Sequence, residues 1–169
     1  GRLRELGDWL KREGRGFEML ALYEDYLLFD YPDAHEDHFL WLNPRPAEEK
    51  IIDELLRLYQ GESLIKQLQN AIAVHPDNSR LHRNLAYVLL QSTRYQEGLH
   101  SGEVYLTVLD QVTASDYQWL GSLCAEAGIL EEAIAFYESA CVMKLTALVL
   151  RAESMTASMG ASDIHWQKR

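Results

Sequence analysis

The stretch YQWLGSLCAEAGILEEAIAFYESA, residues 117–140, decides the fold of this chain. Its apolar residues recur at helical spacing on both sides of Gly128, which predicts two helices that turn at this glycine. The same pattern stands 35 residues earlier, with small and aromatic residues at matching positions: Ala86 and Gly121, Gly98 and Ala133, Gly102 and Tyr137, Tyr105 and Ala140. A fixed period of this length in a helical sequence indicates stacked helix pairs, which form a surface for holding another molecule.

Outward from this stretch, the whole chain has the pattern of helices. Its prolines fall where helices should end or begin, and no strand-like alternation persists. We expect one all-α domain over residues 1–160, a right-handed superhelical stack of antiparallel helix pairs with a C-terminal capping helix. The expected parts are repeats at about 2–32, 46–77, 79–112 and 114–145, an insertion at 34–44, the capping helix at 145–158 and a tail at 161–169.

Residues 117–140 resemble the tetratricopeptide repeat (TPR) family of helical-repeat proteins. Gly121 and Ala133 are small where two helices would cross closely, and Tyr137 fills the space beside them. The N-terminus repeats this pattern 114 residues earlier, where Leu6-Gly7, Gly14 and Tyr23-Glu24 match Leu120-Gly121, Gly128 and Tyr137-Glu138. The resemblance touches most of residues 3–143 and implies a TPR-like α-solenoid.

The helix expected at about 94–109 departs from the family pattern. Gly102 stands where an aromatic residue is usual and Tyr105 where alanine is usual, and both lie on one helix face. We therefore expect Tyr105 to fill the volume that Gly102 leaves. Gly98 and Gly102 cost about 1 kcal/mol each relative to alanine, so this helix is predicted to be the least stable of the stack.

The resemblance implies that the first helix of each pair faces a concave groove that binds a partner. The groove residues would be Arg80, Arg83, Tyr87 and Leu90 in the third pair, with Gln118 and Ser122 in the fourth. Arg80, Arg83 and Tyr87 share one helix face, where two guanidinium groups beside an aromatic ring can grip a carboxylate and an apolar group. The alternative is a solvated helix end with simply exposed arginines.

The insertion at 34–44 carries two further features. Phe39 and Trp41 belong to an apolar cluster that either docks the insertion onto the stack or forms a secondary binding patch, a route to self-association. His35 and His38 share a helix face, but no third ligand stands at a fixed spacing. A solvated helix start is therefore expected here, and we predict neither a metal nor a cofactor.

The composition of the chain limits the classes of partner that we expect. The formal net charge of −10 argues against nucleic acid and anionic membranes and favours a basic peptide or protein face. We find no secretory signal and no apolar run long enough to cross a bilayer, so we expect a soluble chain without membrane insertion, with the cytoplasm favoured. Cys124 and Cys141 are expected as small apolar residues on facing helices, with a disulfide between them as the minor alternative.

The functional prediction follows from the repeat architecture. The sequence has no phosphate-binding glycine loop, no His-Glu-x-x-His motif and no nucleophile–base arrangement, so we expect no enzyme. We predict a non-catalytic protein-interaction module, an adaptor or assembly scaffold that binds a protein or peptide in its groove. The alternative is a TPR component of an export or polysaccharide-secretion assembly that contacts carbohydrate or other subunits.

Overall fold

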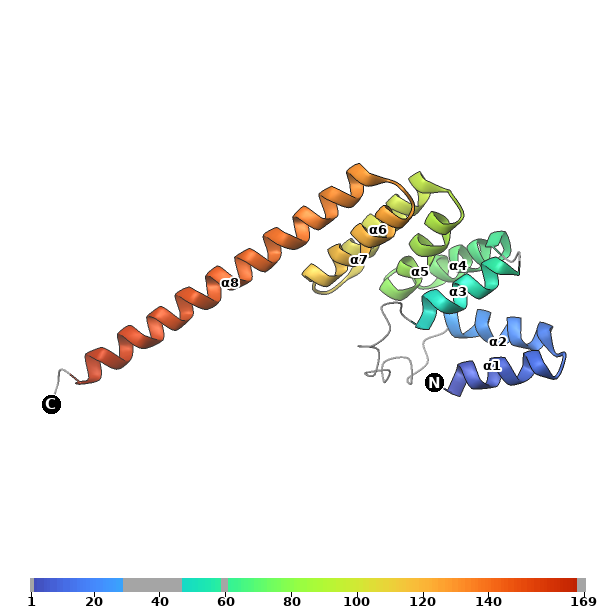
Figure 1. The fold of residues 1–169 in the computed structure, drawn as a ribbon, viewed down its shortest axis with the longest axis horizontal. Coiled ribbons are helices and arrows are strands. Elements are labelled where there is room, and N and C mark those ends of the chain that lie inside the picture. The colour runs from blue at the N-terminus through green and yellow to red at the C-terminus, as the bar shows by residue number, and fades with distance from the viewer. Residues whose placement is uncertain (1, 29–46, 59–60, 167–169) are drawn as a thin grey trace. The chain divides into compact units, whose positions relative to one another are not determined.

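The structure, a computed structural model, describes residues 2–28, 47–58 and 61–166, and within these ranges every regular element is a helix (Figure 1). The helices are α1 (Arg2–Arg12), α2 (Gly16–Leu28), α3 (Ala47–Arg57), α4 (Gly61–Val74), α5 (Ser79–Gln91), α6 (Tyr95–Val108), α7 (Ala114–Glu126) and α8 (Leu130–Trp166). Their bounds lie close to the predicted helix pairs up to residue 143. The predicted insertion at 34–44 lies outside the described residues.

The chain divides into two compact units, Gly1–Leu109 and Asp110–Arg169. The single domain predicted over 1–160 stays a prediction. The first unit holds α1 to α6 and the second holds α7 and α8. The expected right-handed superhelix of all the repeats stays a prediction, because it concerns the arrangement of one unit on the other.

Three turns between paired helices share one backbone design. Gly14, Thr93 and Gly128 each follow the first helix of a pair and have φ of 74°, 62° and 81°. The next residue closes the turn with a backbone hydrogen bond: Arg15 N to Leu10 O at 2.8 Å, Arg94 N to Leu89 O at 2.9 Å, and Ile129 N to Cys124 O at 2.9 Å. This pattern satisfies carbonyl groups at the end of the first helix. It reverses the chain so that the second helix packs back on the first.

Glycine permits the close helix crossings that the sequence predicts. A Cβ atom on Gly121 would lie 3.0 Å from two ring carbons of Tyr137, and one on Gly7 would lie 2.6 Å from Cζ of Tyr23. The two contacts are equivalent, because each glycine lies under the tyrosine of the second helix of its own pair. The predicted role of Gly7 and Gly121 as small residues at a crossing is therefore confirmed.

Helix α5 is the centre of the first unit, and it packs against α2, α3, α4 and α6. Leu81, Val88 and Leu89 of this helix are almost completely buried, as are Ile52 of α3 and Leu68 of α4. The side chain of Asn78 caps α5 by accepting hydrogen bonds from two backbone N–H groups of its first turn. Tyr105, on α6, is also buried, as expected for a residue that fills space beside Gly102.

Helices α7 and α8 form the second unit and run side by side over the first part of α8 (Figure 1). The two helices pack on each other, and Leu120 and Cys124 of α7 are buried, as are Ala133 and Ala140 of α8. At the start of α7, the carboxylate of Asp116 accepts a hydrogen bond from the backbone of Thr113 at 2.8 Å, which caps the helix.

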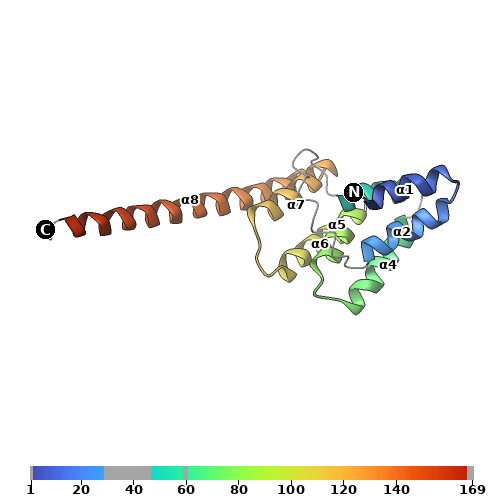
Figure 2. The same cartoon turned by 90° about the horizontal axis from the view of Figure 1, so that it is seen from below.

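Beyond this contact, α8 does not stop. It continues as one helix to Trp166, so the separate capping helix predicted at 145–158 is wrong, and the predicted tail begins inside the same helix (Figure 2). The physical reason is the absence of any glycine, proline or capping residue between Val142 and Leu145. Every residue from Lys144 to Gly160 is exposed, so this part of the helix covers no core of its own unit.

Candidate functional site

Three of the four predicted groove residues of α5 bind neighbouring helices of their own unit. A guanidinium N–H of Arg80 donates a hydrogen bond to the carbonyl of Tyr26 on α2, and the group lies 5.3 Å from the centre of that ring. The hydroxyl of Tyr87 donates to the carboxylate of Asp53 on α3 at 2.7 Å. Arg83 lies 4.0 Å from the carboxylate of Glu49, which is itself buried.

These contacts place the α5 residues in a polar seam that fastens α5 to α2 and α3. Tyr87 is only 1% exposed and Leu90 only 2%. Their predicted place on an open groove is corrected, because the ring and the aliphatic chain are part of the core. Arg80 and Arg83 are half-buried at the edge of the same seam.

The predicted groove residues of the fourth pair have a different environment. Gln118 and Ser122 both lie on the exposed face of α7. The hydroxyl of Ser122 is 2.9 Å from the hydroxyl of Tyr137, which lies over Gly121. These two residues belong to the second unit and the four α5 residues to the first. Partner binding by Gln118 and Ser122 stays a prediction, made on a face that is open.

The insertion features cannot be placed. Phe39 and Trp41, the predicted secondary patch, lie outside the described residues, as do His35 and His38. Among the residues that the structure does describe, no group of three His, Cys, Asp or Glu side chains is close enough to hold a metal ion.

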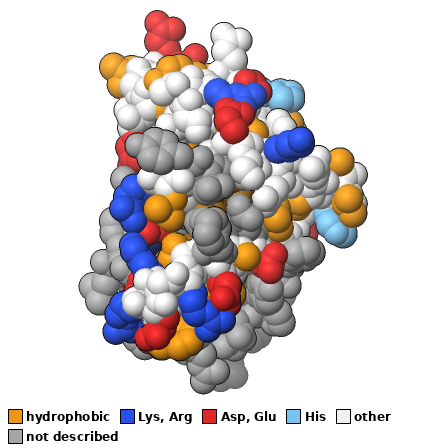
Figure 3. All heavy atoms as spheres, turned by 90° about the vertical axis from the view of Figure 1, so that its right-hand side faces the viewer, with side chains coloured by type: hydrophobic (Ala, Val, Ile, Leu, Met, Phe, Trp, Pro, Cys, Tyr) orange, Lys and Arg blue, Asp and Glu red, His pale blue; other side chains and the backbone are white. Residues whose placement is uncertain are grey.

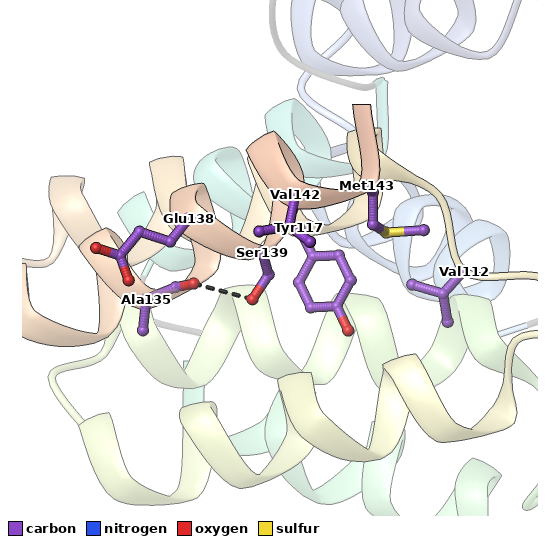
Figure 4. A pocket seen from close by; sticks show the side chains of 7 residues that line it. All are labelled: Val112, Tyr117, Ala135, Glu138, Ser139, Val142 and Met143. Atoms are coloured by element: carbon purple, nitrogen blue, oxygen red, sulfur yellow. Dashed lines mark hydrogen bonds between the residues drawn. The ribbon is translucent and has the colours of Figure 1, made fainter. Parts of the chain in front are cut away.

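The second unit has a shallow hollow of about 700 Å³ between the start of α7 and one side of α8 (Figure 4). Its lining residues are Val112, Tyr117, Ala135, Glu138, Ser139, Val142 and Met143. The Ser139 hydroxyl donates to the carbonyl of Ala135 at 3.0 Å, so its own helix uses that proton. Glu138 supplies a carboxylate at the rim of a mostly apolar wall.

Opposite charges lie next to each other on the first unit. On the face in Figure 3, Lys and Arg side chains alternate with Asp and Glu, and no basic region stands out there. The ion pairs of this unit include Arg57 with Glu54 at 2.6 Å and Lys11 with Glu54 at 3.0 Å. Hydrogen bonds from Arg57 and, to a smaller extent, from Lys11 lower the pKa of Glu54 to about 2.

The most distinctive surface of the described chain is apolar and lies on α8. We define the α8 apolar face as Cys141, Leu145, Leu148, Ala152, Met155 and Met159. Leu145 is 62% exposed and Met159 68%, and the other four are also exposed. At 3.6 residues per turn these six residues fall within an arc of about 80°. Contiguous exposed apolar side chains of this kind mark sites of protein or membrane contact.

The same helix passes a test of length and average composition for crossing a bilayer over Leu130–Gly160. The prediction concerned uninterrupted apolar runs, and this helix has scattered polar residues within an apolar average.

The two cysteines differ sharply, and no disulfide joins them. Cys124 is fully buried and Cys141 is exposed. Burial, with a smaller contribution from the Glu132 carboxylate, raises the pKa of the Cys124 thiol to about 11. The prediction of two small apolar residues on facing helices holds for Cys124, whereas Cys141 faces solvent from the α8 apolar face.

Comparisons with known proteins identify no family. No known family matches the sequence, and no curated protein matches it. Among solved structures, the chain is similar to the crystal structure of MamA, with 16% sequence identity and a TM-score of 0.49. That match covers 86% of this chain and 78% of the MamA chain. We therefore base the functional proposal on the chain's own surfaces.

Proposed function

We propose that this chain is a non-catalytic protein-binding module, an adaptor or assembly scaffold, and that the α8 apolar face holds its partner. The observation that carries this proposal is the stretch from Lys144 to Gly160, every residue of which is exposed. Three large side chains of the face, Leu145, Leu148 and Met155, are each at least 60% exposed. Covering a side chain of this size contributes about 1.5–3 kcal/mol, so a few of them can support a stable complex.

A bilayer is the competing occupant of this helix, and the geometry disfavours it. The part of α8 before Lys144 is tied to α7, because Ala133 and Ala140 are buried against that helix. The helix continues to Trp166, but the polar residues Ser162, Asp163 and His165 follow Gly160. The apolar part from Lys144 to Gly160 is therefore about 25 Å long at 1.5 Å per residue, less than the ~30 Å of a hydrocarbon core. It also carries Lys144, Arg151 and Glu153.

The exposed face of α7 is a second part of the same proposal. Gln118 and Ser122, the predicted groove residues of the fourth pair, are exposed polar side chains that a peptide can approach. For this face the net charge of −10 favours a basic partner.

The test compares three forms of the full chain as bait for proteins of its source cell. Leu145→Glu/Leu148→Glu removes the α8 apolar face, and Leu150→Glu is the matched control, since Leu150 is 60% exposed on the opposite side of α8. We expect a defined protein to bind the native chain and the control but not the double variant. The same protein must then bind in a purified two-component assay.

Two outcomes would overturn the proposal. Equal binding of every protein by all three forms would mean that the α8 apolar face is no protein-binding surface. The second outcome is that the native chain and the control float with phosphatidylcholine vesicles but the double variant does not. This outcome would mean that the α8 apolar face binds a membrane instead. Circular dichroism must show equal helix content in the three forms.

A further inference from the structure

We infer that the α8 apolar face binds a second copy of this chain, in a parallel two-stranded coiled coil that begins at Cys141. This inference rests on the proposed function, because it names the partner of the same face. Three observations support it: the spacing of the residues in the α8 apolar face, the charged residues beside that face, and the length of helix whose residues are exposed.

The spacing is that of a coiled coil. Successive members of the α8 apolar face lie four, three, four, three and four residues apart, from Cys141 to Met159. This alternation has a mean of 3.5 residues, the repeat with which two helices wind around each other in a left-handed supercoil. A partner helix must carry the same repeat over the same length, about 27 Å at 1.5 Å per residue. A second copy of α8 meets that requirement because its sequence is identical.

The charges beside the face select the parallel arrangement. Lys144 and Arg151 flank it on one side, whereas the other side carries Val142, Val149 and Thr156. In a parallel pair each basic flank lies against the uncharged flank of the partner. An antiparallel pair centred on the face would bring the two Arg151 side chains together, which is unfavourable between like charges.

The sequence before Cys141 indicates where the pairing begins. Continuing the same spacing backwards from Cys141 leads to Glu138. Two Glu138 carboxylates would face each other in a parallel pair, and in this structure Glu138 instead lines the hollow beside α7. The pairing therefore begins at the Cys141 layer, and Ala133 and Ala140 remain free to hold α7.

Helix stability gives an independent reason for a partner. Every residue from 144 to 160 is exposed. Most helical stability in proteins comes from packing of an apolar face. A coiled coil supplies that packing and leaves α7 and its exposed face uncovered.

The first experiment measures the mass of the full chain by light scattering after gel filtration over a series of concentrations. We expect a dimer for the native chain, a monomer for Leu145→Glu/Leu148→Glu and a dimer for Leu150→Glu. A monomer for the native chain at every concentration, or a dimer that the double variant keeps, overturns the inference.

A second experiment tests the parallel register with a short bis-maleimide cross-linker. Cys141 is exposed and would meet its own copy across the pair, whereas Cys124 is buried and its thiol has a raised pKa. We expect a covalent dimer from the native chain and none from Cys141→Ser. A non-covalent dimer that gives no Cys141 cross-link overturns the parallel arrangement.

The failure of this inference can be told apart from failure of the proposed function. In one outcome the native chain stays monomeric but binds a different purified protein, and Leu145→Glu/Leu148→Glu abolishes that binding. This outcome overturns pairing with a second copy but still supports the α8 apolar face as a protein-binding surface. A monomeric chain that binds the same proteins with or without the face overturns both.

Discussion

Replacing Thr93 with glycine is expected to stabilise this protein. Thr93 has φ of 62° in the turn between α5 and α6, where Gly14 and Gly128 serve in the corresponding turns. An L residue in the left-handed conformation pays roughly 1–2 kcal/mol, and a β-branched side chain is a genuine outlier there. Thr93 is also exposed, so its removal takes little packing away.

The net gain is smaller than the strain. Glycine gives the unfolded chain more conformations than threonine, which lowers stability by about 0.4–1 kcal/mol. Subtracting this from the relieved strain leaves a gain of about 1 kcal/mol for Thr93→Gly. Because the free energy of unfolding falls by about 1–3 kcal/mol per M urea, the urea concentration at the unfolding midpoint should rise by roughly 0.5 M.

The measurement is urea unfolding followed by circular dichroism, with two comparison variants. Thr93→Ala keeps a Cβ atom and should recover less than half of the gain. Gly128→Thr introduces the same strain into the turn between α7 and α8, and it should lower stability by about 1 kcal/mol. A neutral or destabilised Thr93→Gly, or a Thr93→Ala that does as well, would refute the strain at this turn.

Three other predictions follow from named contacts. Tyr87→Phe removes the 2.7 Å hydrogen bond to Asp53 and should lower the free energy of unfolding by about 1.5 kcal/mol; unchanged unfolding would show that the seam is not held by this bond. The pKa of Glu54 is about 2 in the folded chain against 4.5 ordinarily, so its ion pairs stabilise the fold above pH 4.5 and this contribution is lost as pH falls toward 2. Because the pairs are largely solvated the effect should be about 0.5–1 kcal/mol, and Glu54→Gln should flatten the acid limb of a stability–pH curve. Maleimide should label Cys141 in the native protein and Cys124 only on unfolding, and equal labelling rates would contradict the burial of Cys124.

The helix pairs could be predicted from sequence because local signals and packing agree there. Gly7 and Gly121 mark close crossings whose tyrosine partners stand at the same spacing, 16 residues later. The turn at Thr93 was harder, since threonine gives no sign of positive φ. Only its place, 35 residues before Gly128, shows that the chain needs a left-handed residue there.

The candidate site was predicted less well. A shared face on one helix shows which residues lie together, but it does not show whether that face meets solvent or another helix. Arg80, Arg83 and Tyr87 do share a face of α5, and that face meets α2 and α3. The acidic partners that decide this, Glu49 and Asp53, stand more than 30 residues earlier in the sequence, where no local pattern links them to α5.

Helix α8 shows how folding and association can be separated in one element. Ala133 and Ala140 face α7 and are buried, whereas the α8 apolar face lies about a quarter turn away around the helix. Glutamate at Leu145 and Leu148 therefore enters solvent in the folded monomer and reaches no part of the α7 contact. Loss of association in that variant, with the unfolding of the α7–α8 unit unchanged, can arise only from the exposed face itself.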